Sequence, residues 1–163
     1  MLYESHAHPF EPVWDKDCRI LMLGSFPSVK SRENAFYYGH PQNRFWKVLS
    51  AVFSDDLPAT VEEKKAFLLK HHMALWDVIA RCDIVGSGDS SIKNAVANDL
   101  QSVLRETNIR HVFLNGQTAG KLYQKHFKQL SVPYTVLPST SPANAAWTAE
   151  KLIDAWKCIG EIR

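Results

Sequence analysis

Three short apolar runs constrain the fold of this chain more than any other feature of its sequence. They are CRILMLG at 18–24, RHVFLNG at 110–116 and VPYTVLPS at 132–139. Each is long enough for one buried strand and ends at a glycine or in a polar turn, and helical patterns fill the segments between them. Strands that alternate with helices pair in parallel through right-handed crossovers. The sequence therefore predicts an α/β protein, a three-layer α/β/α sandwich around a short central parallel sheet.

Five segments have the apolar spacing of amphipathic helices. They begin near Gln42, at the expected cap Thr60, near Ile92 with an end near Glu106, at Gln117, and near Thr148. The run ALWDVI at 74–79 fits a strand as well as a helix, whereas RCDIVGSGDSSI at 81–92 has the glycines and serines of a loop. No linker or repeat divides the chain, so residues 1–163 are expected to form a single domain.

Composition and charge exclude several classes of protein. With 45% hydrophobic residues the chain can bury a core, and a formal net charge of +2 means that any nucleic-acid site must be local. No apolar run reaches the ~20 residues of a membrane helix, and the first residues lack a signal-peptide pattern, so we expect a cytoplasmic protein with no membrane partner. The sequence predicts neither a metal nor another cofactor. Its cysteines are far apart, its histidine pairs (HAH, HH) lack the spacing of metal ligands, and it has no G-x-G-x-x-G motif.

Polar turns follow the three predicted strands: GSFPS, NGQT and PSTSPANA. Ligands of open parallel sheets bind beyond the carboxyl ends of the strands, so these turns should converge on one crevice. The hydroxyls of Ser28, Ser139 and Ser141 suit phosphate oxygens, and the aromatic residues at 26 and 36–38 can stack on a planar base. The combination indicates a nucleotide that is turned out of a nucleic-acid strand.

Five stretches carry a resemblance to a known family. LMLGSFPS, FYYGHPQNRFWKVL, VFLNGQTAGKLY, LPSTSPANAAW and AEKLIDAW resemble, in order and spacing, the uracil-DNA glycosylase superfamily over residues 19–156. The mismatch-specific branch positions water with the asparagine of a GINPG-like motif, where this chain has Phe26. The set is instead similar to the hypoxanthine-DNA glycosylase branch, in which an asparagine of the HPxN segment is catalytic. The resemblance assigns that role to Asn43.

Asn43 and Asp77 are the catalytic residues that the resemblance implies. The Asn43 carboxamide would hold a water against C1′ of the flipped nucleotide; an ordinary helix N-cap is the alternative. Asp77 falls where uracil-specific members have an asparagine that recognises the base edge. Its carboxylate only accepts hydrogen bonds, which suits the N1–H of hypoxanthine that adenine lacks, and it could also act as the general base. The alternative is a solvated or helix-capping aspartate.

The same resemblance assigns binding roles to other motif residues. Tyr38 aligns with the base-stacking aromatic, with a core aromatic as the alternative, and His40 is expected to bond the backbone rather than to be catalytic. The residues expected around the substrate nucleotide are Gly24, Ser25, Phe26, Pro27, Tyr38, His40 and Asn115. Those expected at the DNA are Ser28, Lys30, Ser139, Ser141, Pro142, Ala143 and Asn144. Residues 141–144 match the loop that enters the minor groove in the superfamily, unless this turn only links a strand to a helix.

The resemblance implies a monofunctional DNA glycosylase of base-excision repair. It would act as a monomer on damaged DNA, flip the nucleotide and hydrolyse the N-glycosidic bond of a deaminated base, with hypoxanthine in deoxyinosine preferred. No lysine within the motifs suits Schiff-base chemistry, so the abasic site would stay uncleaved. Two alternatives remain open: a mismatch-specific uracil/thymine-DNA glycosylase, and a non-catalytic nucleic-acid-binding module of the same fold.

Overall fold

A parallel sheet of four strands, in the order β3-β2-β6-β7, forms the centre of the structure. The computed structural model describes residues 3–34 and 36–162. The strands are β2 (Ile20–Gly24), β3 (Met73–Asp77), β6 (His111–Asn115) and β7 (Tyr134–Leu137). In β2, Met22 lies opposite Leu75 of β3 and Phe113 of β6. Three of the strands are those predicted from apolar runs, and the ambiguous run at 74–79 supplies most of the fourth.

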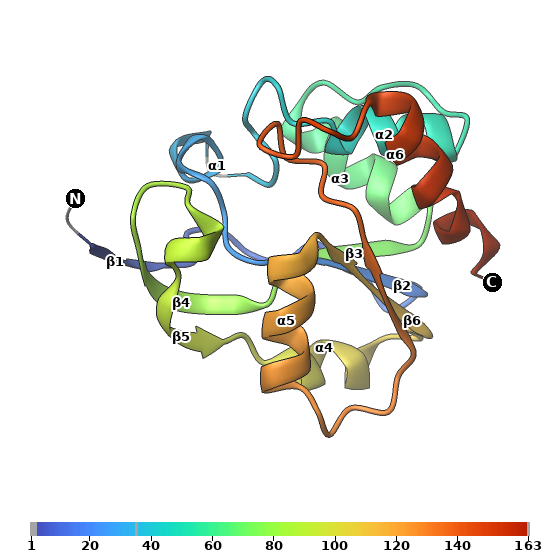
Figure 1. Ribbon diagram of the computed structural model, residues 1–163. Coiled ribbons are helices and arrows are strands. Elements are labelled where there is room, and N and C mark those ends of the chain that lie inside the picture. The colour runs from blue at the N-terminus through green and yellow to red at the C-terminus, as the bar shows by residue number, and fades with distance from the viewer. Residues whose placement is uncertain (1–2, 35, 163) are drawn as a thin grey trace.

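Helices cover both faces of this sheet (Figure 1). One layer holds α2 (Phe45–Val52), α3 (Val61–Lys70) and α6 (Ala149–Trp156), and the other holds α4 (Leu100–Glu106) and α5 (Gln117–His126). Alternate side chains of β2 enter the two cores, so Met22 packs in the core that contains Phe45 and Leu23 packs in the core that contains Tyr123. Because both faces are buried, β2 is apolar along its whole length. The predicted three-layer α/β/α sandwich is confirmed.

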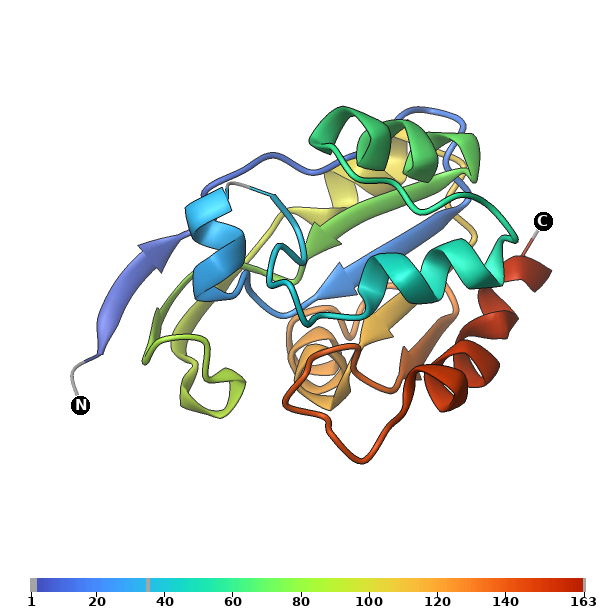
Figure 2. The same cartoon turned by 90° about the horizontal axis from the view of Figure 1, so that it is seen from above.

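A second, antiparallel sheet flanks the first and was not predicted. Its strands, in the order β1-β4-β5, are β1 (Glu4–Ala7), β4 (Ile79–Ile84) and β5 (Lys93–Ala97), seen at one end of the molecule in Figure 2. The prediction of a loop at 81–92 is therefore wrong for its first residues, which belong to β4. Register shifts in the pairing of β4 with β5 break the simple alternation by which a strand is recognised from sequence.

The prediction of one helix from Ile92 to Glu106 is also wrong in its first half. It combined a strand with a helix, because Val96 lies at helical spacing from Leu100. In the structure Val96 is 47% exposed on β5. Asp99 then begins α4, since its side chain accepts a hydrogen bond from Ser102 N.

Capping side chains begin two helices where the sequence indicated. Thr60 accepts from Glu63 N at the start of α3, and Thr148 accepts from Lys151 N at the start of α6. The first expected helix differs, since α2 begins at Phe45 rather than at Gln42. Among the described residues, no helix is both long and apolar enough to cross a membrane.

Three short helices complete the chain. The helix α1 (Val29–Asn34) follows the first strand exit, which was expected to be only a turn. Two 3₁₀ helices, η1 (Asp89–Ser91) and η2 (Lys157–Glu161), lie between β4 and β5 and after α6.

The two sheets join at the carboxyl end of β3, where Val78 alone separates β3 from β4. Val78 N donates to the carbonyl of Gly24 at 2.8 Å, and Ile79 N donates to the carbonyl of Ser25 at 3.1 Å. The buried Asn98 side chain donates to the carbonyl of Asp77. These bonds fix the ends of β2 and β3 next to each other, which determines where the functional site can form.

Candidate active site

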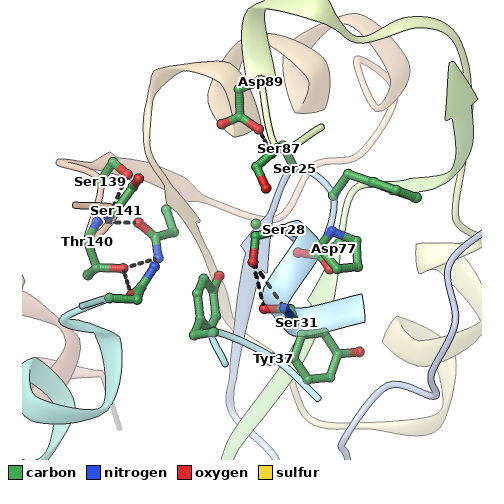
Figure 3. Close-up of a pocket in the computed structure, with 16 residues that line it drawn as sticks. Ser25, Ser28, Ser31, Tyr37, Asp77, Ser87, Asp89, Ser139, Thr140 and Ser141 are labelled. Carbon is green, nitrogen blue, oxygen red and sulfur yellow. Dashed lines mark hydrogen bonds between the residues drawn. The ribbon is translucent and has the colours of Figure 1, made fainter. Parts of the chain in front are cut away.

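The carboxyl ends of the four parallel strands open onto one pocket (Figure 3). Gly24 ends β2, Asp77 ends β3, Asn115 ends β6, and Ser139 to Ser141 follow β7. The predicted site residues that line this pocket are Gly24, Ser25, Phe26, Pro27, Ser28, Tyr38, Asn43, Asp77, Asn115, Ser139 and Ser141. The strand exits therefore converge on one crevice, as the sequence predicted.

A series of hydrogen bonds links Asn43 to two strand exits. Oδ1 of Asn43 accepts from the Thr140 hydroxyl at 2.9 Å. Asn115 bonds the same threonine twice, because its Nδ2 donates to Thr140 Oγ1 and its Oδ1 accepts from Thr140 N, each at 3.0 Å. Thr140 is fully buried. This network holds the segment before α2, the end of β6 and the segment after β7 in one arrangement.

The Asn43 carboxamide can take only one orientation. Its Oδ1 also accepts from the N–H of Phe45, the first residue of α2, at 2.9 Å. A backbone N–H only donates, so the oxygen must face it, and both lone pairs of Oδ1 are then occupied. Within the described chain Nδ2 donates no hydrogen bond and stays available to a ligand of the pocket. Asn43 thus bonds the first N–H of α2 and also lines the pocket, but it is not the N-cap of the alternative reading, because that position is held by Arg44.

Arg44 fastens the loop of residues 139–147 to the start of α2. Its guanidinium donates to four backbone carbonyl groups of that loop, those of Thr140, Ser141, Asn144 and Trp147. Its own N–H also donates to the carbonyl of Thr140, at 3.1 Å. The positive charge of Arg44 is therefore bonded within the protein, where it holds the backbone of the 139–147 loop in place.

A buried histidine holds the carboxyl group of Asp77. Nε2 of His8 lies 2.8 Å from Oδ2 of Asp77, and both side chains are 5% exposed. The other oxygen, Oδ1, points towards Gly24, since a Cβ atom on that glycine would lie 2.5 Å from it. Asp77 ends a strand and is buried, so the alternative of a solvated or helix-capping aspartate is wrong.

Tyr38 lies beside Gly24 with its hydroxyl group buried. Its ring stacks on Phe45, with centroids 4.0 Å apart and planes inclined by 21°. The hydroxyl would lie 2.8 Å from a Cβ on Gly24 and has no hydrogen-bond partner in the described part of the chain. Burial, and then the charge of Asp77, raise the pKa of Tyr38, so the side chain is a neutral phenol.

A second carboxyl group reaches the pocket from the 3₁₀ helix η1. The Ser25 hydroxyl donates to Oδ1 of Asp89 at 2.7 Å, as Figure 3 shows. The residue as a whole is exposed, but the loss of water around its carboxyl group raises the pKa of Asp89, and the bond from Ser25 opposes that shift. Two acidic groups, those of Asp77 and Asp89, therefore share the pocket.

The other predicted site residues lie outside this pocket. Nδ1 of His40 accepts from Gln42 N at 3.0 Å, which confirms its expected bond to the backbone. Lys30 is exposed and pairs with Glu33 at 3.4 Å. Ala143 and Asn144 line an adjoining cavity, and Pro142 is not among the residues that line either cavity. Nδ2 of Asn144 donates to the carbonyl of Ser139.

Sequence reasoning missed four residues that line the pocket: Ser31, Ser87, Asp89 and Thr140. Tyr37, which was considered only among the aromatic residues at 36–38, also lines it. Thr140 lies between two serines that were selected for phosphate contacts, so its position in PSTSPANA was an available signal. Ser87 and Asp89 reach the pocket only because the second sheet brings their loop there. His8 had no signal except HAH, which does not have metal spacing.

Comparisons with known proteins agree on one family. A family model described as the Uracil DNA glycosylase superfamily matches residues 12–160. The chain is 36% identical over 145 residues to Hypoxanthine DNA glycosylase of Methanosarcina acetivorans, covering 87% of this chain and 90% of the relative. It is 33% identical over 138 residues to Hypoxanthine DNA glycosylase of Methanosarcina barkeri, covering 83% and 86%. The solution NMR structure of a candidate uracil DNA glycosylase from M. acetivorans matches with a TM-score of 0.78 at 29% identity, over 93% of this chain and 96% of that one.

Proposed function

Because the chain belongs to the uracil DNA glycosylase superfamily and is a DNA glycosylase, we propose that it removes hypoxanthine from deoxyinosine in damaged DNA. Two relatives at 33% and 36% identity are named hypoxanthine DNA glycosylases. The observation that carries the proposal is the polar content of the pocket. The resemblance puts Phe26 where the mismatch-specific branch has its water-positioning asparagine, and Asn43 supplies a carboxamide to the pocket that Phe26 also lines.

The substrate nucleotide would have to leave the DNA helix to reach this site. The pocket lies beyond the ends of the parallel strands and is lined by buried groups such as Ser25 and Asp77, which a stacked base cannot contact. Extrusion of a nucleotide from the duplex costs roughly a few kcal/mol, and it costs least where the base pair is already weak. An inosine mispair is therefore extruded more readily than a normal pair, and this difference begins the selection of the lesion.

Asp77 would recognise the base through Oδ1. Its Oδ2 is bonded to His8, so Oδ1 is the acceptor turned towards Gly24. Hypoxanthine presents an N1–H donor to such an acceptor, whereas adenine presents a lone pair that the carboxylate repels. Tyr38, backed by Phe45, would offer its other ring face to the base. The acceptor thus favours the deaminated purine over adenine.

Hydrolysis would use a water held by Nδ2 of Asn43. Cleavage of the glycosidic bond gives an oxocarbenium-like sugar, which water attacks without a strong nucleophile. Oδ1 of Asn43 already accepts two hydrogen bonds, so the amide nitrogen is the group left to hold the water oxygen. No lysine is among the described residues that line the pocket, which supports excision without a Schiff base and an abasic product in an uncleaved strand.

Serine hydroxyls at the 139–147 loop would bind the DNA backbone. Ser139 Oγ accepts from Ser141 N, and Ser141 Oγ accepts from Ala143 N, each at 3.1 Å. Both hydroxyl protons are then available to phosphate oxygens. Residues 141–144 would enter the minor groove while Arg44 holds the loop from the protein side.

A panel of duplexes, each with one deoxyinosine, uracil or mispaired thymine, tests this function. We expect hypoxanthine to be released fastest, with strand breaks appearing only after alkaline treatment of the abasic product. Faster release of uracil or thymine would assign the chain to mismatch repair. Binding to an abasic-site duplex without turnover on any substrate would contradict the proposal.

Replacing Gly24 with alanine should block the base. The new Cβ would lie 2.5 Å from Asp77 Oδ1 and 2.8 Å from the Tyr38 hydroxyl, so both groups must shift. We expect the free energy of unfolding to fall by about 1–3 kcal/mol, the usual cost of overpacking. We also expect the single-turnover rate on deoxyinosine to fall about 100-fold, because a displacement of this size misplaces the reacting groups. Gly160→Ala, where a Cβ has open space, is the control, and equal rates for the two variants would contradict the prediction.

A further inference from the structure

His8 contacts the pocket from the N-terminal segment, and no step of the proposed reaction uses it. It follows β1, and its backbone N–H donates to the carbonyl of Ala80 in β4 at 2.7 Å. Its ring packs edge-on against Phe10, with centroids 4.7 Å apart, and lies 5.8 Å from the ring of Tyr37. The imidazole is therefore fixed on several sides, with Asp77 as its polar partner in the site.

The hydrogen bonds of His8 define where its protons are. Nδ1 lies 2.8 Å from the carbonyl oxygen of Phe10, which can only accept, so Nδ1 carries a proton. Nε2 lies 2.8 Å from Asp77 Oδ2, and one proton lies between these two atoms. The pair is then either an imidazolium with a carboxylate or an imidazole with a carboxylic acid. In both forms Oδ2 is occupied and Oδ1 remains towards Gly24.

We propose that His8 is a positioning residue for base recognition: its bond to Oδ2 fixes the Asp77 carboxyl group and keeps the shared proton away from Oδ1, so that Oδ1 is an acceptor. This role rests on the proposed function of the pocket. A buried carboxylate without a partner is costly and takes up a proton instead. Without His8, a protonated Asp77 could carry its proton on Oδ1 and donate to the base, and it would no longer select the N1–H of hypoxanthine. The interaction between His8 and Asp77 therefore sets which hydrogen bond the pocket offers.

A double-mutant cycle measures whether His8 acts through Asp77. We expect His8→Ala to lower the single-turnover rate on a deoxyinosine duplex at least about 10-fold at pH 7, the scale of losing one hydrogen bond to a charged group. Adding His8→Ala to Asp77→Ala should cause no further loss, because the group that His8 positions is gone. His6→Ala is the matched control, since His6 lies on β1 and, among the described residues, its side chain pairs with the exposed Glu4. If His8→Ala does not fold, His8→Gln, whose amide can still donate to Asp77, takes its place in the cycle, again with an expected loss of rate because a glutamine amide cannot share its proton with the carboxyl group.

The rate measured against pH separates this role from a structural one. Without His8 the Asp77 carboxyl group loses the partner that shares its proton, so the pH dependence of the rate should change in His8→Ala and stay as in the wild type in His6→Ala. The titratable groups that face Asp77 are His8, Tyr37, Tyr38 and Asp89. Burial raises the pKa of both tyrosines, which keeps them neutral. Any part of the pH profile that is due to Asp89 would persist in Asp77→Ala.

The outcomes are distinct. A wild-type protein that does not act on deoxyinosine overturns the proposed function. An active wild type overturns the role of His8 if His8→Ala leaves the rate and the pH profile unchanged, or if it costs as much in the Asp77→Ala background as in the wild type. A loss of rate that occurs only where Asp77 is intact, together with the altered pH profile, supports the role of His8.

Discussion

Replacing Asn43 with alanine should lower the single-turnover rate of hypoxanthine excision by about 100-fold or more, the scale of losing one preorganised polar group at a reacting centre. The alanine keeps no donor for the attacking water. It also removes the acceptor of the Phe45 N–H and of the Thr140 hydroxyl, so the free energy of unfolding should fall by about 1 kcal/mol, the usual net contribution of a hydrogen bond. Rapid-quench kinetics and urea denaturation measure the two effects.

Asn43→Ser separates these two contributions. The serine hydroxyl can also accept from the N–H two residues later, as Oδ1 of Asn43 does, but serine has no amide nitrogen. We expect nearly wild-type stability together with the low rate of the alanine variant. A serine variant as active as the wild type would show that Asn43 serves only the helix start, and the hydrolytic role would have to be given up.

Replacing Arg44 with alanine should have the largest effect on stability. Hydrogen bonds to charged groups contribute about 1.5–3 kcal/mol each, but carbonyl groups near the surface regain bonds to water, so we expect a net loss of about 2–4 kcal/mol in the free energy of unfolding. The 139–147 loop should loosen, and affinity for an abasic-site duplex should fall. Urea denaturation and a fluorescence binding titration measure the two losses.

Two further variants test the assignment of Arg44. Arg44→Lys should recover only part of the stability, because an ammonium group cannot reach several carbonyl groups with the fixed fork of a guanidinium. Lys47→Ala is the control for loss of positive charge, since Lys47 is exposed on the same helix. If Lys47→Ala weakens DNA binding as much as Arg44→Ala while stability is unchanged in both, Arg44 acts as a phosphate contact and not as a support of the loop.

The central sheet and the place of the pocket were predictable because the signals were local. Apolar runs such as ILMLG are buried on both faces, and parallel strands must direct their polar exits to the same edge. Asp77 and Asn115 meet in the pocket for that reason, and Asn43 joins them from the segment before α2. Their assignment as a set came from the family resemblance, since each residue alone has an ordinary structural interpretation.

The second sheet and its contributions could not be predicted in the same way. Its strand β5 is short and mostly exposed, with Val96 on the solvent side, so no hydrophobic period identifies it. The contact between His8 and Asp77 joins positions 69 residues apart and depends on the pairing of β1 with β4. The hydrogen bonds of Thr140 likewise depend on tertiary structure, since asparagines from two distant segments meet at one hydroxyl.

Thr140 bonds two consecutive residues of the segment before α2: its hydroxyl donates to Asn43, and its carbonyl accepts from Arg44. Thr140 therefore connects the 139–147 loop, which is expected to enter the minor groove, to the Asn43 amide, which is expected to hold the water. A movement of the loop on contact with a duplex would be transmitted directly to the reacting centre. Contact of the loop with a lesion and positioning of the water for hydrolysis would then change together, without a separate element that connects them.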